Sequence, residues 1–313
     1  MLDVYSVYQI VGIAMLGLTA GVLGGMLGVG GSVLIIPALA ILLGRPTGVE
    51  QHLYQAAAMI ANVAVSIPAA LRHRRAGAMN RTVLTWMLPS ALLFIVVGVW
   101  ASNLPIFAGP EGGLWLGRLL AVFLIYVIIV NALRLRPAKP QPPAGPGPAE
   151  TRSTDPPSNP ALGAEYEDGP PRVTGPRSAT IGSVMGTLAG LLGIGGGGIA
   201  VPLQQTLLRL PLRQCIANSS AVICVTAAVG AIYKNATLAG RVGPDTAARI
   251  QELNLAPIDW TTGLTLGLLL APTAWAGGRL GAALTHRLPL RAIRVAFIAL
   301  MLVAAWKMAA LPT

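Results

Sequence analysis

The chain has 313 residues, of which 54% are hydrophobic and only 11% carry a charge, whereas a soluble domain usually carries about 25% charged residues. This composition, with a mean hydropathy of +0.67, excludes a soluble globular protein and predicts a protein embedded in a lipid bilayer. The formal net charge of +11 does not indicate a nucleic-acid partner, because the basic residues form short clusters between apolar stretches.

In chain order, hydropathy predicts a series of apolar spans, most of them close to the length of about 20 residues that a bilayer requires. They cover residues 8–27, 51–71, 83–103, 114–134, 178–194, 214–233, 260–283 and 292–311. The N-terminus lacks the basic region of a signal peptide, since no Lys or Arg precedes Arg45, so we expect the first helix to be retained. Two shorter apolar pieces, 33–43 and 199–208, are each long enough for only about half of the hydrocarbon core. We expect these pieces to be half-helices, or to form helical hairpins with the segments before them.

Residues 137–176 separate the two apolar halves and differ from both in composition. Twelve prolines and five acidic residues fall in this stretch, which cannot bury enough apolar area to fold. The sequence therefore predicts a first transmembrane repeat in 1–136, a disordered cytoplasmic linker in 137–176, and a second transmembrane repeat in 177–313. No motif in the linker indicates a regulatory docking role.

Basic clusters predict the orientation of the chain in the membrane, because Lys and Arg favour the cytoplasmic side. Three clusters are assigned to that side: Arg72, Arg74, Arg75 and Arg81; Arg134, Arg136 and Lys139; and Arg287, Arg291 and Arg294. The N-terminus and the charge-balanced loop 234–259 then lie outside. With about five helical elements in each half, the second half enters from the opposite side, which is the inverted-repeat arrangement of many secondary transporters.

A glycine-rich passage occurs once in each half, in residues 21–37 and 186–202, and 8 of its 17 aligned positions are identical. Glycines at every fourth position, such as Gly17, Gly21 and Gly25, predict close packing between helices. The denser clusters are different, because each glycine destabilises a helix by about 1 kcal/mol relative to alanine. These clusters contain Gly28, Gly30 and Gly31 in the first half, and Gly193, Gly195, Gly196 and Gly197 in the second.

The dense clusters predict two broken helices inside the membrane, where unwound backbone is tolerated only if protein or water satisfies it. The N–H groups at the start of the half-helix that follows would form an anion site, strengthened by the helix dipole. The alternative, that both clusters are ordinary close-packing motifs, stays open. Gly193, Gly195 and Gly198 also match a dinucleotide fingerprint, but a membrane helix precedes them instead of a strand, so we expect no nucleotide cofactor.

Polar residues interrupt the apolar helix that follows each cluster. In the second half these are Asn218, Ser219 and Ser220, and in the first half a weaker set of Gln55, Asn62 and Ser66. Such side chains either bond neighbouring helices or line a substrate cavity.

The only charge well inside a span is that of Arg279, which is a functional candidate unless its side chain snorkels to the membrane surface. His52, His73 and His286 resemble loop or helix-end residues and have no ligand spacing with one another. Cys215 and Cys224, both in one apolar segment, predict neither a disulfide framework nor a metal site.

Several of these segments together resemble the sulfite exporter TauE/SafE family of bacterial permeases. They are residues 25–31 and 190–196, the proline six residues beyond each, residues 218–220 and residues 277–281. The resemblance covers nearly the whole chain apart from the linker. It implies a multi-pass protein of the bacterial inner membrane that moves sulfur-containing anions such as sulfite, sulfonates or sulfoacetate. The chain departs from the pattern in its long linker, and in having residues 56–58 as alanines where the second half has Asn218 to Ser220.

The sequence therefore predicts an all-α polytopic membrane protein that transports a small anion. It leaves open whether a proton or a sodium ion is coupled to this transport. The glycine clusters would present backbone N–H groups, Asn218, Ser219 and Ser220 would orient the anion, and Arg279 would supply a long-range positive potential. The alternative is a membrane enzyme or assembly factor that does not transport. An enzyme should show an acid/base pair or metal ligands within the membrane, and we find no catalytic residues of that kind. None of these patterns specifies an oligomeric state.

Overall fold

The computed structural model describes residues 6–44, 47–133, 171–253 and 256–284, together with Val295, 298–299 and 301–302. Helices form nearly all of this part of the chain, and it contains no strand, so the predicted all-α class is confirmed. Five of its helices are long and apolar enough to cross a membrane, which agrees with the predicted membrane protein.

The predicted spans correspond to seven long helices. These are α1 (Val7–Leu27), α3 (Glu50–Arg75), α4 (Arg81–Ser102), α5 (Gly109–Leu133), α6 (Gly175–Leu192), α8 (Leu212–Ala236) and α10 (Trp260–Leu284). The two short apolar pieces form the half-helices α2 (Ser32–Leu43) and α7 (Gly197–Leu207). The predicted linker lies outside the described residues up to residue 170, and most of the predicted span 292–311 does too.

Three elements were not predicted from the sequence: the 3-10 helices η2 (Pro105–Phe107) and η4 (Ala239–Arg241), and the helix α9 (Pro244–Glu252). Helix α9 begins with a proline in its first turn and buries only Thr246 and Ile250. Its other side chains are largely polar, so a search for apolar spans does not detect it.

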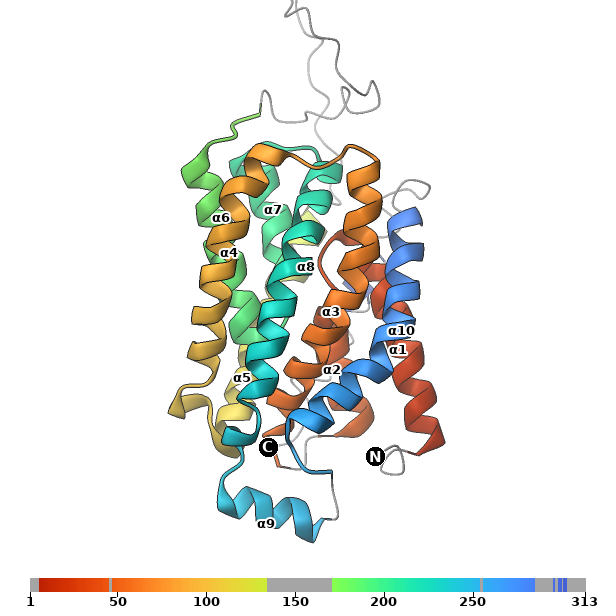
Figure 1. Ribbon diagram of the computed structural model, residues 1–313, viewed down its shortest axis with the longest axis vertical. Helices are drawn as coiled ribbons and strands as arrows, with labels where there is room; N and C mark the ends of the chain where they lie inside the picture. Colours follow the sequence, from red (N-terminus) through yellow and green to blue (C-terminus); the bar gives the residue numbers. More distant parts are fainter. Residues whose placement is uncertain are drawn as a thin grey trace, which may run out of the picture.

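The two halves of the chain are interleaved in one bundle (Figure 1). Helix α1 packs along α10 and α6 packs along α4, so each half places one helix against the other half. Helices α3 and α8 pack against each other between these two pairs. In Figure 1, α1, α3 and α10 run in one direction along the bundle, and α4, α6 and α8 run in the opposite direction.

Glycines at four-residue spacing lie where these helix pairs touch. A Cβ atom added to Gly21 of α1 would lie 2.5 Å from the carbonyl oxygen of Ala274 in α10. A Cβ atom added to Gly186 of α6 would overlap the carbonyl oxygen of Ala91 in α4. The absence of side chains therefore permits the close backbone approach, and the packing interpretation of these glycines is confirmed.

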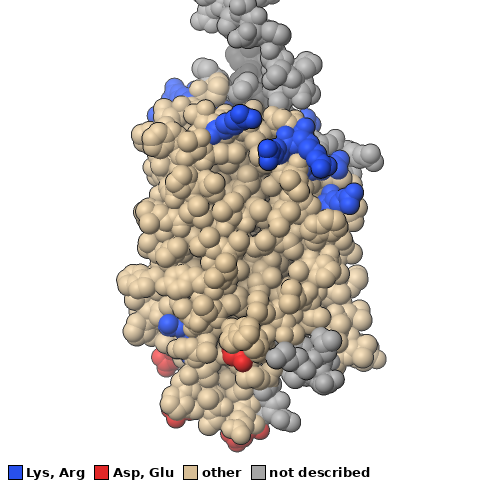
Figure 2. Space-filling model, in the orientation of Figure 1, with Lys and Arg blue, Asp and Glu red and all other residues tan. Residues whose placement is uncertain are grey.

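Charged side chains gather at the two ends of the bundle and leave its middle apolar (Figure 2). The arginine-rich end is where α3 ends and α4, α6 and α8 begin, and it carries Arg72, Arg74, Arg75, Arg81, Arg172, Arg177, Arg209 and Arg213. The acidic end is where α3 and α10 begin and α4 and α8 end. It carries all the acidic residues of the described part of the chain, together with some basic ones: Glu50, Glu111, Asp245, Glu252 and Asp259, with Lys234, Arg241 and Arg249. That the arginine-rich end faces the cytoplasm stays a prediction from the positive-inside rule.

Candidate functional site

Each half contains a buried turn that breaks its helix at the predicted glycine cluster. In the first glycine turn (28–31), α1 ends at Gly28 with φ 63°, and Gly30 has φ 85°. In the second glycine turn (193–196), φ lies between 71° and 74° at Gly193, Gly195 and Gly196. Residues with a Cβ rarely adopt these values, so glycine at these positions lets the chain leave one helix and start the next.

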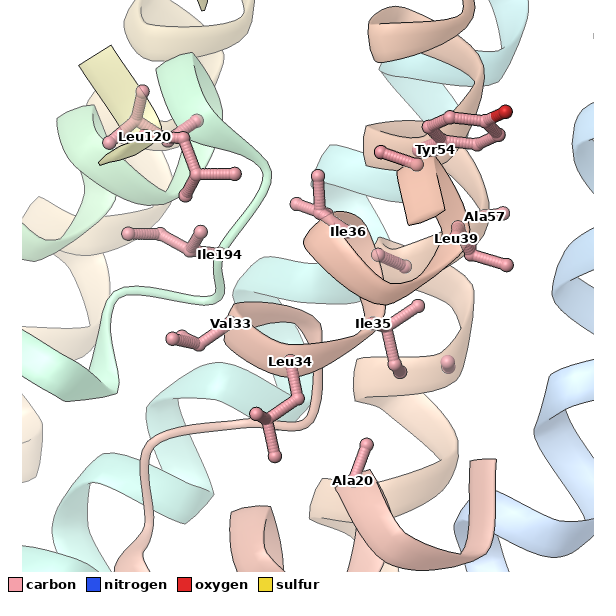
Figure 3. Packing of buried hydrophobic residues seen from close by; sticks show 14 of the residues in the cluster. Ala20, Val33, Leu34, Ile35, Ile36, Leu39, Tyr54, Ala57, Leu120 and Ile194 are labelled. Atoms are coloured by element: carbon pink, nitrogen blue, oxygen red, sulfur yellow. The ribbon is translucent and has the colours of Figure 1, made fainter. Parts of the chain in front are cut away.

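The half-helices that follow the turns are buried in the interior of the bundle. Helix α2 is buried along most of its length, and in Figure 3 its Leu39 lies beside Ala57 of α3. Because α2 is apolar on all sides, the bundle core is where it can bury its whole surface. This packing fixes the position of the first glycine turn.

The two glycine turns meet at the centre of the protein. A Cβ atom on Gly197, the first residue of α7, would overlap the carbonyl oxygen of Gly28. Each turn also contacts a long helix of the other half. A Cβ atom on Gly28 would lie 2.8 Å from the carbonyl oxygen of Ile216 in α8, and one on Gly193 would lie 2.8 Å from Cβ of Gln55 in α3.

Asn62 of α3 lies between the two turns and is fully buried. Its Oδ1 accepts a hydrogen bond from the backbone N–H of Ser32 at 3.0 Å, and its Nδ2 donates to Ser32 Oγ at 2.7 Å. A Cβ atom on Gly30 would lie 3.0 Å from Asn62 Oδ1, and one on Gly195 would lie 2.7 Å from Asn62 Nδ2. Asn62 therefore caps the start of α2 and touches the turns of both halves.

Gln55 adds a second amide on the same face of α3, seven residues before Asn62. It is fully buried, and its Nε2 donates to the carbonyl oxygen of Leu191 at 3.4 Å. Its Oε1 is buried and has no hydrogen-bond partner among the described residues. The second glycine turn therefore runs along a polar face of α3, although the sequence indicates the weaker of the two polar segments there.

The start of α7 presents backbone donors to this junction. The N–H groups of Gly197 and Gly198 are buried in the first turn of the helix. No described residue accepts a hydrogen bond from either of them, and no side chain caps α7. Unpaired N–H groups at a helix start carry partial positive charge and bind anions readily.

Asn218 and Ser219 lie in a separate hydrogen-bond network on α8. Asn218 Nδ2 donates to Gln204 Oε1 at 3.0 Å, and Gln204 Nε2 donates to Ser219 Oγ at 3.0 Å. The backbone N–H of Asn80 donates to Asn218 Oδ1 at 2.9 Å. These side chains join α7, α8 and the start of α4. They therefore bond neighbouring helices, which is one of the two roles that the sequence allows for them. Ser220 is buried next to them and is not part of the network.

Arg279 is not brought together with the other predicted site residues. Its side chain is exposed on the outside of α10, with the guanidinium 5.8 Å from the centre of the Trp275 ring. The neighbouring Gly278 faces inward, where a Cβ atom would lie 2.5 Å from the carbonyl oxygen of Val65. Arg279 lies near the arginine-rich end of α10, a position that matches a side chain snorkelling along a hydrophobic surface.

Sequence comparisons identify a family and two longer relatives. The family model described as "Sulfite exporter TauE/SafE" matches residues 13–308. The chain is 30% identical over 321 residues to the probable membrane transporter protein MamO of Paramagnetospirillum magneticum, and 30% identical over 322 residues to MamO of Magnetospirillum gryphiswaldense. Both alignments cover 97% of this chain and 45% of the relative, so the chain spans less than half the length of these proteins.

A third relative has a similar length. The chain is 27% identical over 288 residues to the probable membrane transporter protein YunE of Bacillus subtilis, an alignment that covers 90% of both chains. No solved structure matches the chain significantly.

Proposed function

The chain belongs to the sulfite exporter TauE/SafE family, and from this premise we propose that it is a secondary transporter of small sulfur-containing anions in the bacterial inner membrane. The relatives are named as probable membrane transporters, which supports transport. The observation that carries the proposal is the meeting of the two glycine turns at Asn62, next to the unpaired N–H groups that begin α7.

The electrostatics of this junction favour an anion of low charge. A helix N-terminus carries about half an elementary positive charge, so the starts of α2 and α7 together supply about one. A sulfonate or hydrogen sulfite carries one negative charge, and its oxygens can accept several hydrogen bonds at once. The junction therefore suits a singly charged oxyanion better than a doubly charged one.

The amides of α3 would complete the site. In the structure, Asn62 Oδ1 accepts a hydrogen bond from the backbone N–H of Ser32. It therefore lies where an anion oxygen would bind at a helix start. On anion binding, the carboxamide would turn its Nδ2 toward the ligand and release the start of α2. Gly30, Gly31, Gly195 and Gly196 would keep the backbone close enough for this exchange, because they add no side chain to the junction.

The proposed transport cycle uses two inverted repeats. It is supported by the directions of the helices, since α1 and α3 of the first half run opposite to α6 and α8 of the second. The packing pairs also correspond, because α1 on α10 is the counterpart of α6 on α4. A site between two such repeats can be exposed to each side of the membrane in turn.

Counterflow in proteoliposomes tests the proposal. Purified full-length protein is reconstituted with unlabelled sulfite or methanesulfonate inside, and uptake of the labelled anion is measured, with protein-free liposomes as the control. We expect saturable counterflow of sulfur oxyanions that excess unlabelled sulfite inhibits and phosphate does not. If no sulfur anion shows counterflow with folded protein, the proposed substrate class is wrong.

A further inference from the structure

A buried lysine lies at the acidic end of the bundle, away from the glycine turns. Lys234, in the last turn of α8, is only 1% exposed. Its Nζ donates to Ser102 Oγ at 2.8 Å and lies 2.9 Å from His52 Nδ1. These are its only side-chain partners among the described residues, and neither is an acid. A buried ammonium without a counter-ion is unusual, because buried charges are normally paired.

The sequence predicts Lys234 in the loop that follows the span 214–233. The structure corrects this, because α8 continues to Ala236 and encloses the side chain. His52 does lie at a helix end, in the first turn of α3, but it is fully buried. Both residues therefore face the protein interior, whereas a loop position would have exposed them to water.

The hydrogen-bond partners define the proton positions around the lysine. His52 Nε2 lies 2.8 Å from the carbonyl oxygen of Phe107, which can only accept, so Nε2 carries hydrogen and Nδ1 is the acceptor for Lys234. Ser102 Oγ donates to the carbonyl oxygen of Val99 at 2.8 Å, and so it also accepts from Lys234.

These contacts can hold one exchangeable proton. An ammonium at Lys234 donates to His52 and Ser102, and a neutral amine still has two hydrogens for the same two acceptors. The proton can also move to His52 Nδ1, which would then donate to the amine. Proton binding or release at the pair therefore requires no hydrogen bond to be abandoned.

The charges that face the pair limit it to one proton. The charged residue near Lys234 and His52 is Arg241 of η4. Its guanidinium donates a hydrogen bond to the carbonyl oxygen of Asn103 and lies beside Tyr233. Helix α4 contributes only the uncharged Ser102. On the α10 side, Gly263 packs against Asn235. Two protons on the pair would put like charges 2.9 Å apart, which is unfavourable.

The pair connects the two halves of the protein at this end. Lys234 belongs to the second half, whereas His52 and Ser102 belong to the first and lie on different helices, α3 and α4. His52 is also ten residues from Asn62 on α3, or about 15 Å along the helix axis. A movement of α3 at the acidic end would therefore be transmitted to the glycine turns.

We propose that Lys234 and His52 form a proton-binding pair, and that binding of one proton there is coupled to movement of the anion. With the proton bound, charge-assisted hydrogen bonds hold α8 against α3 and α4 and close the acidic end. When the proton leaves to water, the remaining neutral hydrogen bonds are about half as strong, and this end opens more readily. The coupling rests on the proposed permease function, whereas the proton-binding pair does not.

Histidine NMR tests the pair without any transport. The chain has only 3 histidines, so the protein labelled with 15N-histidine gives few signals, and His52→Gln identifies the one of interest. We expect the His52 signal to change with pH as the pair takes up its proton, and this change to move by about one pH unit or more in Lys234→Gln, which keeps a donor but cannot ionise. Arg249→Gln, an equal charge change at an exposed site on α9, should leave it unaltered. A His52 signal that does not change with pH, or that titrates identically in Lys234→Gln, would refute the pair.

Proteoliposomes with a pH gradient test the coupling. One pH unit stores about 1.4 kcal/mol per proton, which supports about tenfold accumulation of an anion that moves with one proton. We expect this accumulation from the wild type and from Arg249→Gln, whereas Lys234→Gln and His52→Gln should lose it and keep counterflow. Full accumulation by both of these variants overturns the coupling. If the wild type shows no counterflow, the permease proposal fails and the coupling with it, while the NMR titration still decides the proton-binding pair.

Discussion

Changing Asn62 to aspartate should weaken anion binding about a thousandfold and leave the fold intact. Asn62→Asp keeps the shape of the side chain, and its Oδ1 can still accept from the backbone N–H of Ser32. A carboxylate is also favourable at the start of α2, where the helix dipole is positive. The substitution therefore places a fixed negative charge in the position proposed for the substrate.

The size of the effect follows from Coulomb's law. Two negative charges about 4 Å apart repel by about 4 kcal/mol at an effective dielectric constant of about 20. Every 1.4 kcal/mol corresponds to about a tenfold change in affinity, so Asn62→Asp should weaken binding about a thousandfold.

Calorimetric titration of the purified protein with sulfite and methanesulfonate measures this change, and thermal unfolding verifies that the variant is folded. Asn103→Asp is the control, because it introduces the same charge at the acidic end of the bundle. Its effect on affinity should be much smaller, since Coulomb repulsion falls with distance and Asn103 lies at the end of the bundle. If folded Asn62→Asp binds the anions as well as the wild type does, Asn62 does not face the site.

Three other changes give separate tests. Gly186→Ala should lower the melting temperature and destabilise the fold by about 1–3 kcal/mol, because the new Cβ overlaps the carbonyl oxygen of Ala91. Anion affinity should hardly change, and an unchanged melting temperature would contradict the packing role. Gln204→Ala leaves Asn218 and Ser219 without their partner, so the free energy of unfolding should fall by about 1–3 kcal/mol while counterflow is retained. Loss of anion binding in the folded variant would instead assign this network to the site. Ser153→Cys in the predicted linker should react with an impermeant thiol reagent only from the cytoplasmic side, and labelling from outside would reverse the topology.

The spans and the glycine turns could be predicted because each depends on local properties. An apolar stretch of sufficient length forms a membrane helix whatever its neighbours are, and a dense glycine cluster weakens a helix wherever it lies. Helix α9 was missed because its polar residues give no hydropathy signal, although Pro244 at its start was an available indication.

The composition of the site depended on contacts between distant parts of the chain. Asn218 and Ser219, which the sequence predicts to orient the anion, are both hydrogen-bonded to Gln204 of α7, and their contact with an anion stays a prediction. Gln204 was visible as a polar residue inside an apolar half-helix, which could have indicated this network. Gln55 and Asn62 contact the glycine turn of the other half because the two halves are interleaved. Neither segment has a sequence pattern that indicates this packing.

Hydropathy indicates where a residue lies along a membrane helix, but it does not indicate toward which side of the helix the side chain points. Arg279 is an example of this limit. Gly277, Gly278 and Gly281 occupy the buried face of α10, and Arg279 therefore lies on the outward face. Four-residue glycine spacing already marks the packed face of such a helix, so the direction of Arg279 could have been inferred from its neighbours.

The most direct test of the central claim is to locate a bound anion in a crystal of the protein. Selenite is a chemical analogue of sulfite, and its selenium can be found from anomalous scattering. The account predicts a selenium peak at the junction of the two glycine turns, within hydrogen-bond distance of the N–H of Gly197 and of Asn62. A peak only among the arginines of the arginine-rich end, with none at the junction, would contradict it.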